Sequence, residues 1–302
     1  MNKVIVIVGP TGVGKTKLSI ELAKYFHSEI INGDSVQVYK ELNIGSAKVK
    51  EEEKENIKHH LLDIKNIEDN YTIYDYQNDV RNKIKEFNDS NLIPIIVGGS
   101  GLYLKAALYD YKFSDEDGKD NLYEDLSNEE VYELLMQKDE KEALKLHVNN
   151  RKRVVRALNI IEKSKTTKSD ILENQNHKPI YDICFIGLTL PRDVLYERIN
   201  KRVDKMIEEG LIEEVRELYN KYKDNNYKSL QAIGYKELFS YFNNEITLEE
   251  ALELIKKKSR NYAKRQYTWF NNQFNTKWFN VNLDDFDETV KEVMDYVRDY
   301  NG

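Results

Sequence analysis

The sequence predicts an α/β fold, in which helices flank a parallel β-sheet. Residues 3–8 form a continuous, mostly apolar run, which is typical of a strand buried on both faces. The motif G-x-x-x-x-G-K-T follows at residues 9–16, and apolar residues at helical spacing follow over residues 18–26. Since a strand, a glycine turn and a helix are the context that this motif requires, the predicted sheet is P-loop NTPase-like.

The P-loop motif predicts a site for a diphosphate or a longer phosphate chain. Its glycines let backbone N–H groups converge on phosphate oxygens, and the N-terminus of the following helix adds partial positive charge. Lys15 supplies a point charge for the terminal phosphate, and Thr16 supplies a hydroxyl for Mg²⁺. A purely structural glycine turn is the alternative, and the motif does not say which bond is broken. The expected diphosphate-binding residues of the motif are Gly9, Pro10, Thr11, Gly12, Val13, Gly14, Lys15 and Thr16.

Two further strands are expected to end beside the P-loop. Residues 29–32 lead into a turn that contains Asp34, and residues 92–97 lead into a glycine-rich turn that contains Ser100. Pro94 indicates a position early in its strand or near a sheet edge. Because ligands gather at the carboxyl ends of strands in such sheets, Asp34 could bind Mg²⁺ indirectly or act as a base. A turn or helix-capping role for Asp34 is the alternative.

The other elements are expected from apolar spacing and from capping residues. Thr247 followed by Glu250 is a capping box, which predicts the start of a helix. Arg198 and Arg202 share one face of another helix, and Arg202 could clamp a diphosphate if this face overlooks the P-loop. The expected elements are helices over 73–87, 102–108, 191–210, 211–222, 247–270 and 286–299, several short helices within 128–173, and a strand within 180–190.

Composition indicates a domain boundary and two basic patches. Residues 114–130 hold eight acidic residues and one lysine, which is typical of a boundary or an exposed linker. Residues 151–156 hold four cations, and residues 256–265 hold six. In the second patch, Tyr262 lies among the cations, and Tyr267, Trp269 and Phe270 follow them. Cations with aromatics are typical of an RNA-binding surface, whereas packed helices with solvated charged faces are the alternative.

Bulk properties narrow the class of protein. The 302 residues carry a net charge of −7, which argues only weakly against nucleic acid because local patches decide that question. No apolar run approaches the roughly 18 residues of a membrane span, and the N-terminal run is too short for a signal peptide. Cys184 is the single cysteine, so an intrachain disulfide is excluded and a reducing cytoplasm is expected. The five histidines show no metal-ligand spacing.

Several stretches together resemble one family, the tRNA dimethylallyltransferases, also called tRNA isopentenyltransferases. The resemblance covers nearly the whole chain, and the matching stretches occur in the family's order. The chain departs from the family's usual residues at Asn43, Ser46, Ser100, Val148 and Asn159, and Ser100 keeps the hydroxyl of the usual threonine. The matching stretches are GPTGVGKT (9–16), GDSVQVYKELNIGSAK (33–48), HHLLDI (59–64), VGGSGLY (97–103), HVNNRKRVVRAL (147–158), LYERINKRVDKMIEEGLIEEV (195–215), QAIGYKEL (231–238) and RNYAKRQYTWF (260–270).

The resemblance implies transfer of a dimethylallyl group from dimethylallyl diphosphate to N6 of the adenosine just 3′ of the anticodon in tRNA. It implies that Asp34 is the catalytic carboxylate and that Lys15, Thr16 and Mg²⁺ neutralise the departing diphosphate. Ser35, Val36 and Gln37 would continue the segment that contacts the adenosine, and Ser100 would hold the base or its phosphate. The other residues that the resemblance assigns to tRNA binding are Lys152, Arg153, Arg156, Gln231, Gly234, Tyr235, Lys236, Lys264, Arg265 and Gln266.

The resemblance also implies the domain organisation. Residues 1–113 and 179–302 would form the P-loop core with C-terminal helices, and residues 114–178 would form a small all-helical insert over the anticodon stem-loop. The protein is expected to be a monomer with no membrane contact. Three rival functions are an adenylate isopentenyltransferase acting on a free nucleotide, a P-loop kinase that needs ATP, and an RNA-binding P-loop protein without catalysis.

Overall fold

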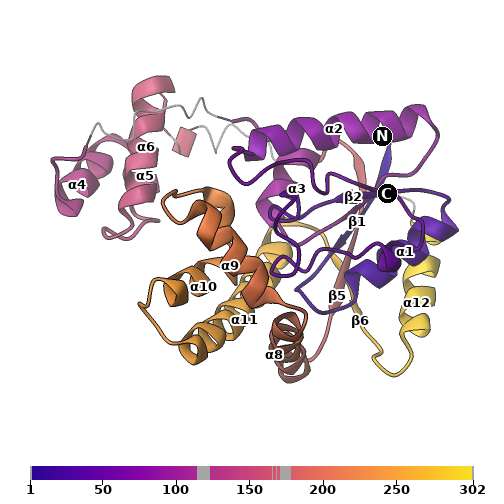
Figure 1. Cartoon of the computed structure of the whole chain (residues 1–302). Helices are drawn as coiled ribbons and strands as arrows, with labels where there is room; N and C mark the ends of the chain where they lie inside the picture. The colour runs from indigo at the N-terminus through magenta and orange to yellow at the C-terminus, as the bar shows by residue number, and fades with distance from the viewer. Residues whose placement is uncertain (1, 114–122, 165, 168, 171–177, 301–302) are drawn as a thin grey trace. The chain divides into compact units, whose positions relative to one another are not determined.

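The computed structural model describes residues 2–113, 123–164, 166–167, 169–170 and 178–300 (Figure 1). The chain divides into two compact units, one of residues 1–108 and 180–302 and the other of residues 109–179. We call them the core unit and the helical unit. The domain boundaries expected at 113 and 178 fall within a few residues of these divisions. The acidic stretch expected to mark the boundary lies largely outside the described residues, at 114–122.

The core unit is built on a six-stranded sheet in the order β3-β2-β4-β1-β5-β6, and all of its paired strands are parallel. Strand β1 lies inside the sheet, where Val6 pairs with Ile96 on one side and with Phe185 on the other. This position explains its continuous apolar sequence, since both faces of β1 are covered. The strands are β1 (Lys3–Val8), β2 (Ile30–Asn32), β3 (His59–His60), β4 (Ile95–Val97), β5 (Asp182–Thr189) and β6 (Lys277–Asn280).

Helices of the core unit flank this sheet or, like α9 and α10, pack on other helices. Helix α1 packs against α12, and α2 packs against α3. Apolar side chains from α1, α8 and α12 join those of β1 and β5 in one hydrophobic core. Thr247 and Glu250 form the expected capping box at the start of α11. The core-unit helices are α1 (Lys15–Tyr25), α2 (Ile73–Asp89), α3 (Gly101–Leu108), α8 (Arg192–Glu208), α9 (Leu211–Tyr222), α10 (Tyr235–Phe242), α11 (Leu248–Gln273) and α12 (Phe286–Asp299), with short 3₁₀ turns η1 (Glu52–Lys54) and η2 (Lys228–Gln231).

The structure resolves one alternative and adds two strands. Pro94 immediately precedes β4, which lies inside the sheet, so of the two alternatives the position at the start of the strand applies and the edge position does not. The Pro94 carbonyl accepts a hydrogen bond from the Ile5 N–H at 2.9 Å, a role that does not need the missing proline N–H. Strands β3 and β6 were not predicted, because each is very short and has no clear alternation of apolar and polar residues.

The helical unit contains three described helices, α4 (Asn128–Lys138), α5 (Glu140–Ala143) and α6 (Arg151–Ser164). Ser127 and Glu130 form a capping box at the start of α4. These helices confirm the expectation of short helices within residues 128–173 as far as Ser164, and residues 171–173 lie outside the described residues. The unit has a small core of its own. This core consists of Tyr123, Val131, Leu135, Ala143, Val154, Ala157 and Leu158.

Two further expectations concern the single cysteine, Cys184, and membrane-spanning segments. Cys184 is buried and unpaired on β5, as expected for a small apolar side chain. In the part of the chain that the structure describes, no helix is both long enough and apolar enough to cross a membrane.

Candidate active site

A cavity of about 970 Å³ opens in the core unit at the carboxyl ends of the strands. Its lining combines the P-loop, the turns after β2 and β4, the face of α8, the segment before α10 and one side of α11. This is where ligands bind in sheets of this kind, and the volume suits a small substrate. The predicted site residues that line it are Thr11, Gly12, Gly14, Lys15, Thr16, Asp34, Ser35, Val36, Gln37, Arg202, Gln231, Gly234, Arg265 and Gln266.

The P-loop has the backbone that its glycines predict. Gly14 has a φ of 99° and forms the N-cap of α1, a conformation that is strained for other residues. Gly9 has a φ of 141°, and a Cβ at this position would lie 2.7 Å from the Leu188 carbonyl oxygen. Gly9, Pro10 and Val13 are buried behind the loop, so they shape it from within, whereas the other five motif residues face the cavity.

Lys15 folds over the P-loop. Its Nζ donates hydrogen bonds to the carbonyl oxygens of Gly9 at 2.9 Å and Pro10 at 2.7 Å. Burial and the positive charge of Arg202 lower the pKa of Lys15 to about 7, although the carboxylate of Asp34 opposes this shift. The Lys15 ammonium therefore lies among groups that favour an anionic ligand.

Asp34 is held in a defined orientation. Its Oδ1 accepts hydrogen bonds from the backbone N–H groups of Val36 at 2.8 Å and Gln37 at 3.4 Å. The amide of Asn32, a nearly buried residue at the end of β2, bonds both the N–H and the carbonyl of Asp34 at 3.0 Å. Burial raises the pKa of Asp34, and the two N–H groups and the charges of Lys15 and Arg202 oppose this effect. Asp34 thus combines a turn-forming oxygen with a carboxylate at the cavity, so the expected turn role is observed and the chemical role stays a prediction.

The turn after β4 packs directly against the turn after β2. A Cβ at Gly98 would lie 2.0 Å from the Gly33 carbonyl oxygen, so this close approach requires glycine. The expected site residue Ser100 lies outside the cavity lining. Its Oγ accepts a hydrogen bond from the Ser35 N–H at 3.1 Å and donates one to the Ser35 Oγ at 3.2 Å. The Ser100 hydroxyl therefore holds the segment that carries Asp34.

Helix α8 presents two arginines to the P-loop. Arg202 lines the cavity, and its charge acts on both Lys15 and Asp34. Burial lowers the pKa of Arg202, and nearby carboxylates, Glu53 first, oppose that shift. Arg198, one turn earlier, donates from Nε to the Gly12 carbonyl at 3.0 Å. The polar face of α8 thus overlooks the P-loop, which is the condition under which Arg202 was expected to clamp a diphosphate.

Helix α11, which packs against α8, also lines the cavity. The Gly99 carbonyl accepts hydrogen bonds from Gln266 Nε2 at 3.1 Å and from the Tyr262 hydroxyl at 3.3 Å. Gln266 is only 5% exposed, so its side chain serves the turn after β4, whereas Lys264 and Arg265 are exposed. The basic patch on α11 therefore combines the inward side chain of Gln266 with two exposed cations, of which Arg265 also borders the cavity.

The remaining residues assigned to tRNA binding occupy three different environments. Lys152, Arg153 and Arg156 are exposed on α6 of the helical unit, away from its core. Lys236 is exposed near the start of α10. Tyr235 is fully buried, and its hydroxyl donates to a carboxylate oxygen of Glu214 at 2.8 Å.

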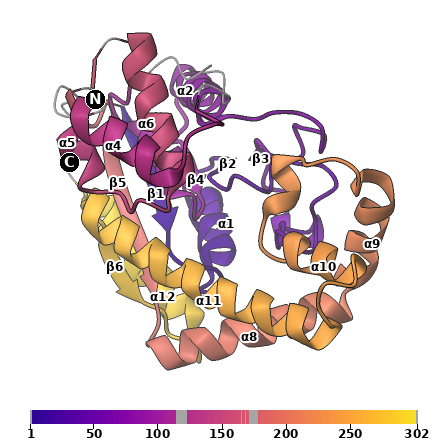
Figure 2. The same cartoon turned by 90° about the vertical axis from the view of Figure 1, so that its left-hand side faces the viewer.

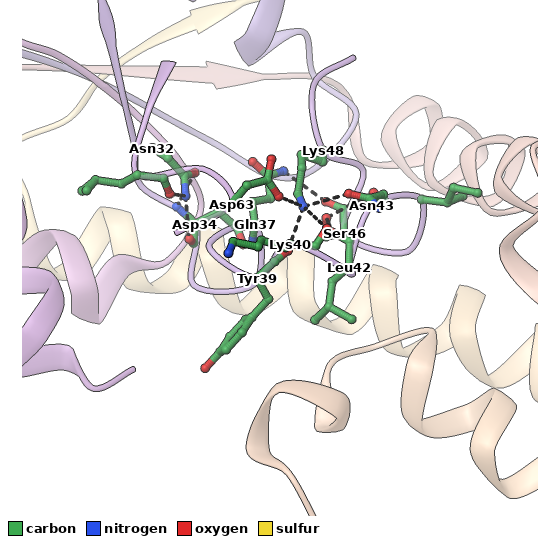
Figure 3. Close-up of polar contacts among 12 residues, drawn as sticks. Asn32, Asp34, Gln37, Tyr39, Lys40, Leu42, Asn43, Ser46, Lys48 and Asp63 are labelled. Atoms are coloured by element: carbon green, nitrogen blue, oxygen red, sulfur yellow. Dashed lines mark hydrogen bonds and ion pairs between the residues drawn. The ribbon is translucent and has the colours of Figure 1, made fainter. Parts of the chain in front are cut away.

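The site also uses residues that were not predicted, among them Lys48, Arg198 and Tyr262, which line the cavity, and Glu214, which bonds the backbone of its wall. Lys48 is 7% exposed and donates to the carbonyl of Tyr39 at 2.8 Å and to Oδ1 of Asn43 at 2.9 Å, next to an ion pair with Asp63 (Figure 3). A lone lysine in a loop carries no periodic signal. Only its place in the family-like stretch of residues 33–48 could have singled it out.

The fold and the cavity place the chain in the P-loop class of α/β proteins. A glycine loop at a helix N-terminus, with a lysine and an arginine beside it, is suited to a diphosphate, and a carboxylate lies within the same cavity. Comparison with known proteins narrows this class. A family model described as IPP transferase matches residues 37–273, and the chain belongs to this family.

Individual relatives agree with the family model. A tRNA dimethylallyltransferase of Anoxybacillus flavithermus is 48% identical, and the match covers 98% of this chain and 96% of the relative. A tRNA dimethylallyltransferase of Bacillus anthracis is 46% identical with the same coverage.

Solved structures show the same fold. The crystal structure of a tRNA isopentenylpyrophosphate transferase from Staphylococcus epidermidis is 41% identical, with a TM-score of 0.75 and coverage of 99% of this chain and 100% of that one. A eukaryotic dimethylallyltransferase described as acting on tRNA is 30% identical, with a TM-score of 0.85 and coverage of 99% of this chain and 79% of that one. The expected P-loop NTPase-like fold and the resemblance stated from the sequence are both confirmed.

Proposed function

We propose that this protein transfers the dimethylallyl group of dimethylallyl diphosphate to N6 of the adenosine immediately 3′ of the anticodon in tRNA. The observation that carries the proposal is the juxtaposition of Lys15 and Asp34 in one cavity, a phosphate-binding cation facing a carboxylate suited to an amine. The names of relatives that are 46–48% identical over 98% of the chain support it.

The P-loop side of the cavity would hold the diphosphate. In the reaction the bond between N6 and C1 of the prenyl group forms, the C1–O bond breaks, and diphosphate leaves with the electron pair. Lys15 and Arg202 would stabilise the negative charge that develops on the leaving oxygen.

The same side of the cavity fits a magnesium ion. Thr16 would be its protein ligand, because Mg²⁺ at phosphate sites takes few protein oxygens and keeps phosphate and water ligands. Among the described residues, no group of three or more His, Cys, Asp or Glu could form a separate metal cage. When bound, Mg²⁺ supplies further charge neutralisation at the diphosphate.

The carboxylate side would receive the adenine. With Oδ1 held by the N–H groups of Val36 and Gln37, the second oxygen of Asp34 would accept a hydrogen bond from the exocyclic amine. Asp34 would orient this amine and take the proton that N6 loses. The base must leave the stack of the anticodon loop to reach a cavity of this kind.

The exposed cations would bind the RNA backbone. We assign phosphate contacts to Lys236, Lys264 and Arg265 of the core unit and to Lys152, Arg153 and Arg156 of the helical unit, which would contact the anticodon stem-loop. Gln231 and Gly234 would contact the RNA at the cavity rim. The buried side chains of Tyr235 and Gln266 would support these contacts indirectly.

A label-transfer assay tests the function. Purified protein, Mg²⁺ and labelled dimethylallyl diphosphate would be mixed with an anticodon stem-loop carrying adenosine 3′ of the anticodon, with the same stem-loop carrying guanosine there, or with AMP. We expect label only on the adenosine stem-loop. Label on AMP would instead support an adenylate isopentenyltransferase, and ATP turnover without prenyl transfer would support a kinase.

Removing the two exposed cations of α11 should weaken tRNA binding in a salt-dependent way. For Lys264→Ala with Arg265→Ala we expect the slope of log K against log salt to fall by about 2, since each phosphate contact contributes roughly 0.9. Fluorescence anisotropy of a labelled stem-loop at several salt concentrations measures this slope. Lys85→Ala with Lys291→Ala, two exposed cations on α2 and α12, is the matched control. An unaltered slope in the α11 variant would show that these cations do not touch phosphates.

Diphosphate binding should depend on the protonation of Lys15. Because the pKa of Lys15 is lowered to about 7, the charged form that binds an anion is present below this pH and is lost above it. Binding of inorganic diphosphate without metal should therefore weaken above pH 7, by up to about tenfold per pH unit, with uptake of a proton. Titration calorimetry in buffers of different ionisation enthalpy measures both effects. Lys15→Met should bind weakly without this pH dependence, and the same pH dependence in the variant would assign it to another group.

A further inference from the structure

One wall of the cavity is a loop of residues 43–48, here called the wall loop, whose backbone is bound by a distant carboxylate. Glu214 of α9 accepts hydrogen bonds from the N–H groups of Asn43 at 3.2 Å, Ile44 at 2.8 Å and Gly45 at 3.2 Å. Three successive N–H groups that converge on one anion form a nest, and such charge-assisted bonds are stronger than neutral ones. Glu214 therefore ties the wall loop to α9, the helix that packs beside α10 (Figure 2).

Tyr235 completes the attachment. Its hydroxyl donates to Glu214 Oε1 at 2.8 Å, and its side chain is fully buried. The wall loop packs directly on its ring, because a Cβ at Gly45 would lie 2.6 Å from the tyrosine Cζ. Burial and the neighbouring Glu214 raise the pKa of Tyr235, so the hydroxyl remains a donor.

The wall loop in turn holds Gln37, which lies beside Asp34. Gln37 Nε2 donates to the carbonyl oxygens of Ser46 at 3.1 Å and Ala47 at 3.2 Å. The Gln37 backbone N–H donates to Oδ1 of Asp34 at 3.4 Å. A continuous set of contacts thus runs from Glu214 through the wall loop to Gln37 and Asp34.

We propose that Glu214 is a positioning residue for the acceptor base, holding the wall loop so that Gln37 and Asp34 present a fixed surface to the adenine. The proposal rests on the proposed function. The contacts lead to the carboxylate side of the cavity and not to the P-loop, so loss of Glu214 should impair use of the RNA and spare diphosphate binding.

Glu214→Gln tests the proposal, because the amide keeps the size of the side chain and loses the charge. We expect the KM for the stem-loop to rise about tenfold and kcat to fall severalfold, with diphosphate affinity unchanged within about twofold. Hydrogen exchange at the amides of residues 43–45 should accelerate about tenfold, since these N–H groups lose their charged acceptor. Glu214→Asp, which keeps the charge, should recover part of the activity. Glu217→Gln, an exposed acid on the same helix, is the matched control.

Each contrary outcome overturns a stated part of the inference. Unchanged exchange at residues 43–45 would show that Glu214 does not hold the wall loop. Faster exchange with wild-type KM and kcat would show that the loop does not position the base. Parallel loss of diphosphate binding and of thermal stability would indicate general damage to the fold. If the wild-type protein prenylates no stem-loop, the proposed function fails, whereas the exchange comparison still decides whether Glu214 holds the loop.

Discussion

Asp34→Asn should reduce kcat by about 10²–10⁴-fold while stem-loop affinity stays within about twofold of wild type. The asparagine oxygen can still accept the hydrogen bonds that Asp34 Oδ1 receives from Val36 and Gln37, so the local turn should persist. The negative charge that orients the exocyclic amine and accepts its proton is lost. Single-turnover transfer of labelled dimethylallyl measures the chemical step apart from product release. Asp34→Ala should lose turnover at least as far.

The pH dependence provides a second test of Asp34. Burial raises the pKa of this carboxyl. As the pH falls, Asp34 should therefore become protonated, and activity should decrease, at a higher pH than for an ordinary aspartate. We expect this acidic limb in the wild-type profile of kcat/KM and expect it to be absent from Asp34→Asn. Wild-type turnover in Asp34→Asn would remove Asp34 from the reaction.

Thermal stability separates this catalytic role from a structural one. Burial of the Asp34 charge disfavours the folded state at neutral pH, so replacement by a neutral isostere should not lower the melting temperature. Asp89→Asn, an exposed aspartate at the end of α2, is the control for a general effect of removing a carboxylate. A large fall in melting temperature of Asp34→Asn would point to a structural role.

Local patterns predicted the parts of the fold that depend on neighbours in the sequence. The P-loop between β1 and α1 and the capping box of α11 each need only a few adjacent residues, and both form as expected. The proximity of Asp34 to the P-loop also followed from sequence, because topology brings the carboxyl ends of parallel strands together. Strands as short as β3 escape such patterns, since a two-residue pairing depends on its partner strand.

The parts of the site that sequence could not predict depend on contacts between distant segments. Glu214 contacts backbone N–H groups some 170 positions earlier in the chain, and backbone groups carry no residue-specific signal. Similarly, the family-like stretch around Gln266 indicated tRNA contact, but only the packing of α11 on Gly99 shows that its side chain faces inward. Resemblance therefore predicted the functional segments, and the structure distinguishes their inward residues from their outward ones.

Arg202→Gln should lower kcat by about 10²–10³-fold, an effect comparable with loss of a charge-stabilising arginine or oxyanion donor in other transfer enzymes. Burial lowers the pKa of both Lys15 and Arg202, and the positive charge of Arg202 lowers the pKa of Lys15 further. A diphosphate relieves this repulsion, and it does so most when the C1–O bond breaks and the leaving group gains charge. The variant should therefore lose more in kcat than in affinity for dimethylallyl diphosphate.

Comparison of single-turnover rates with equilibrium binding of dimethylallyl diphosphate tests this argument. Arg192→Gln is the matched control, because Arg192 is exposed at the start of the same helix and its guanidinium stacks on Tyr196, 5.1 Å from the ring centre. Equal losses in binding and in kcat/KM at an unchanged kcat would mean that Arg202 holds the ground-state diphosphate only. Wild-type rates would mean that Arg202 does not act on the leaving group, and the stabilisation of its charge would then be assigned to Lys15 and other cations that line the cavity.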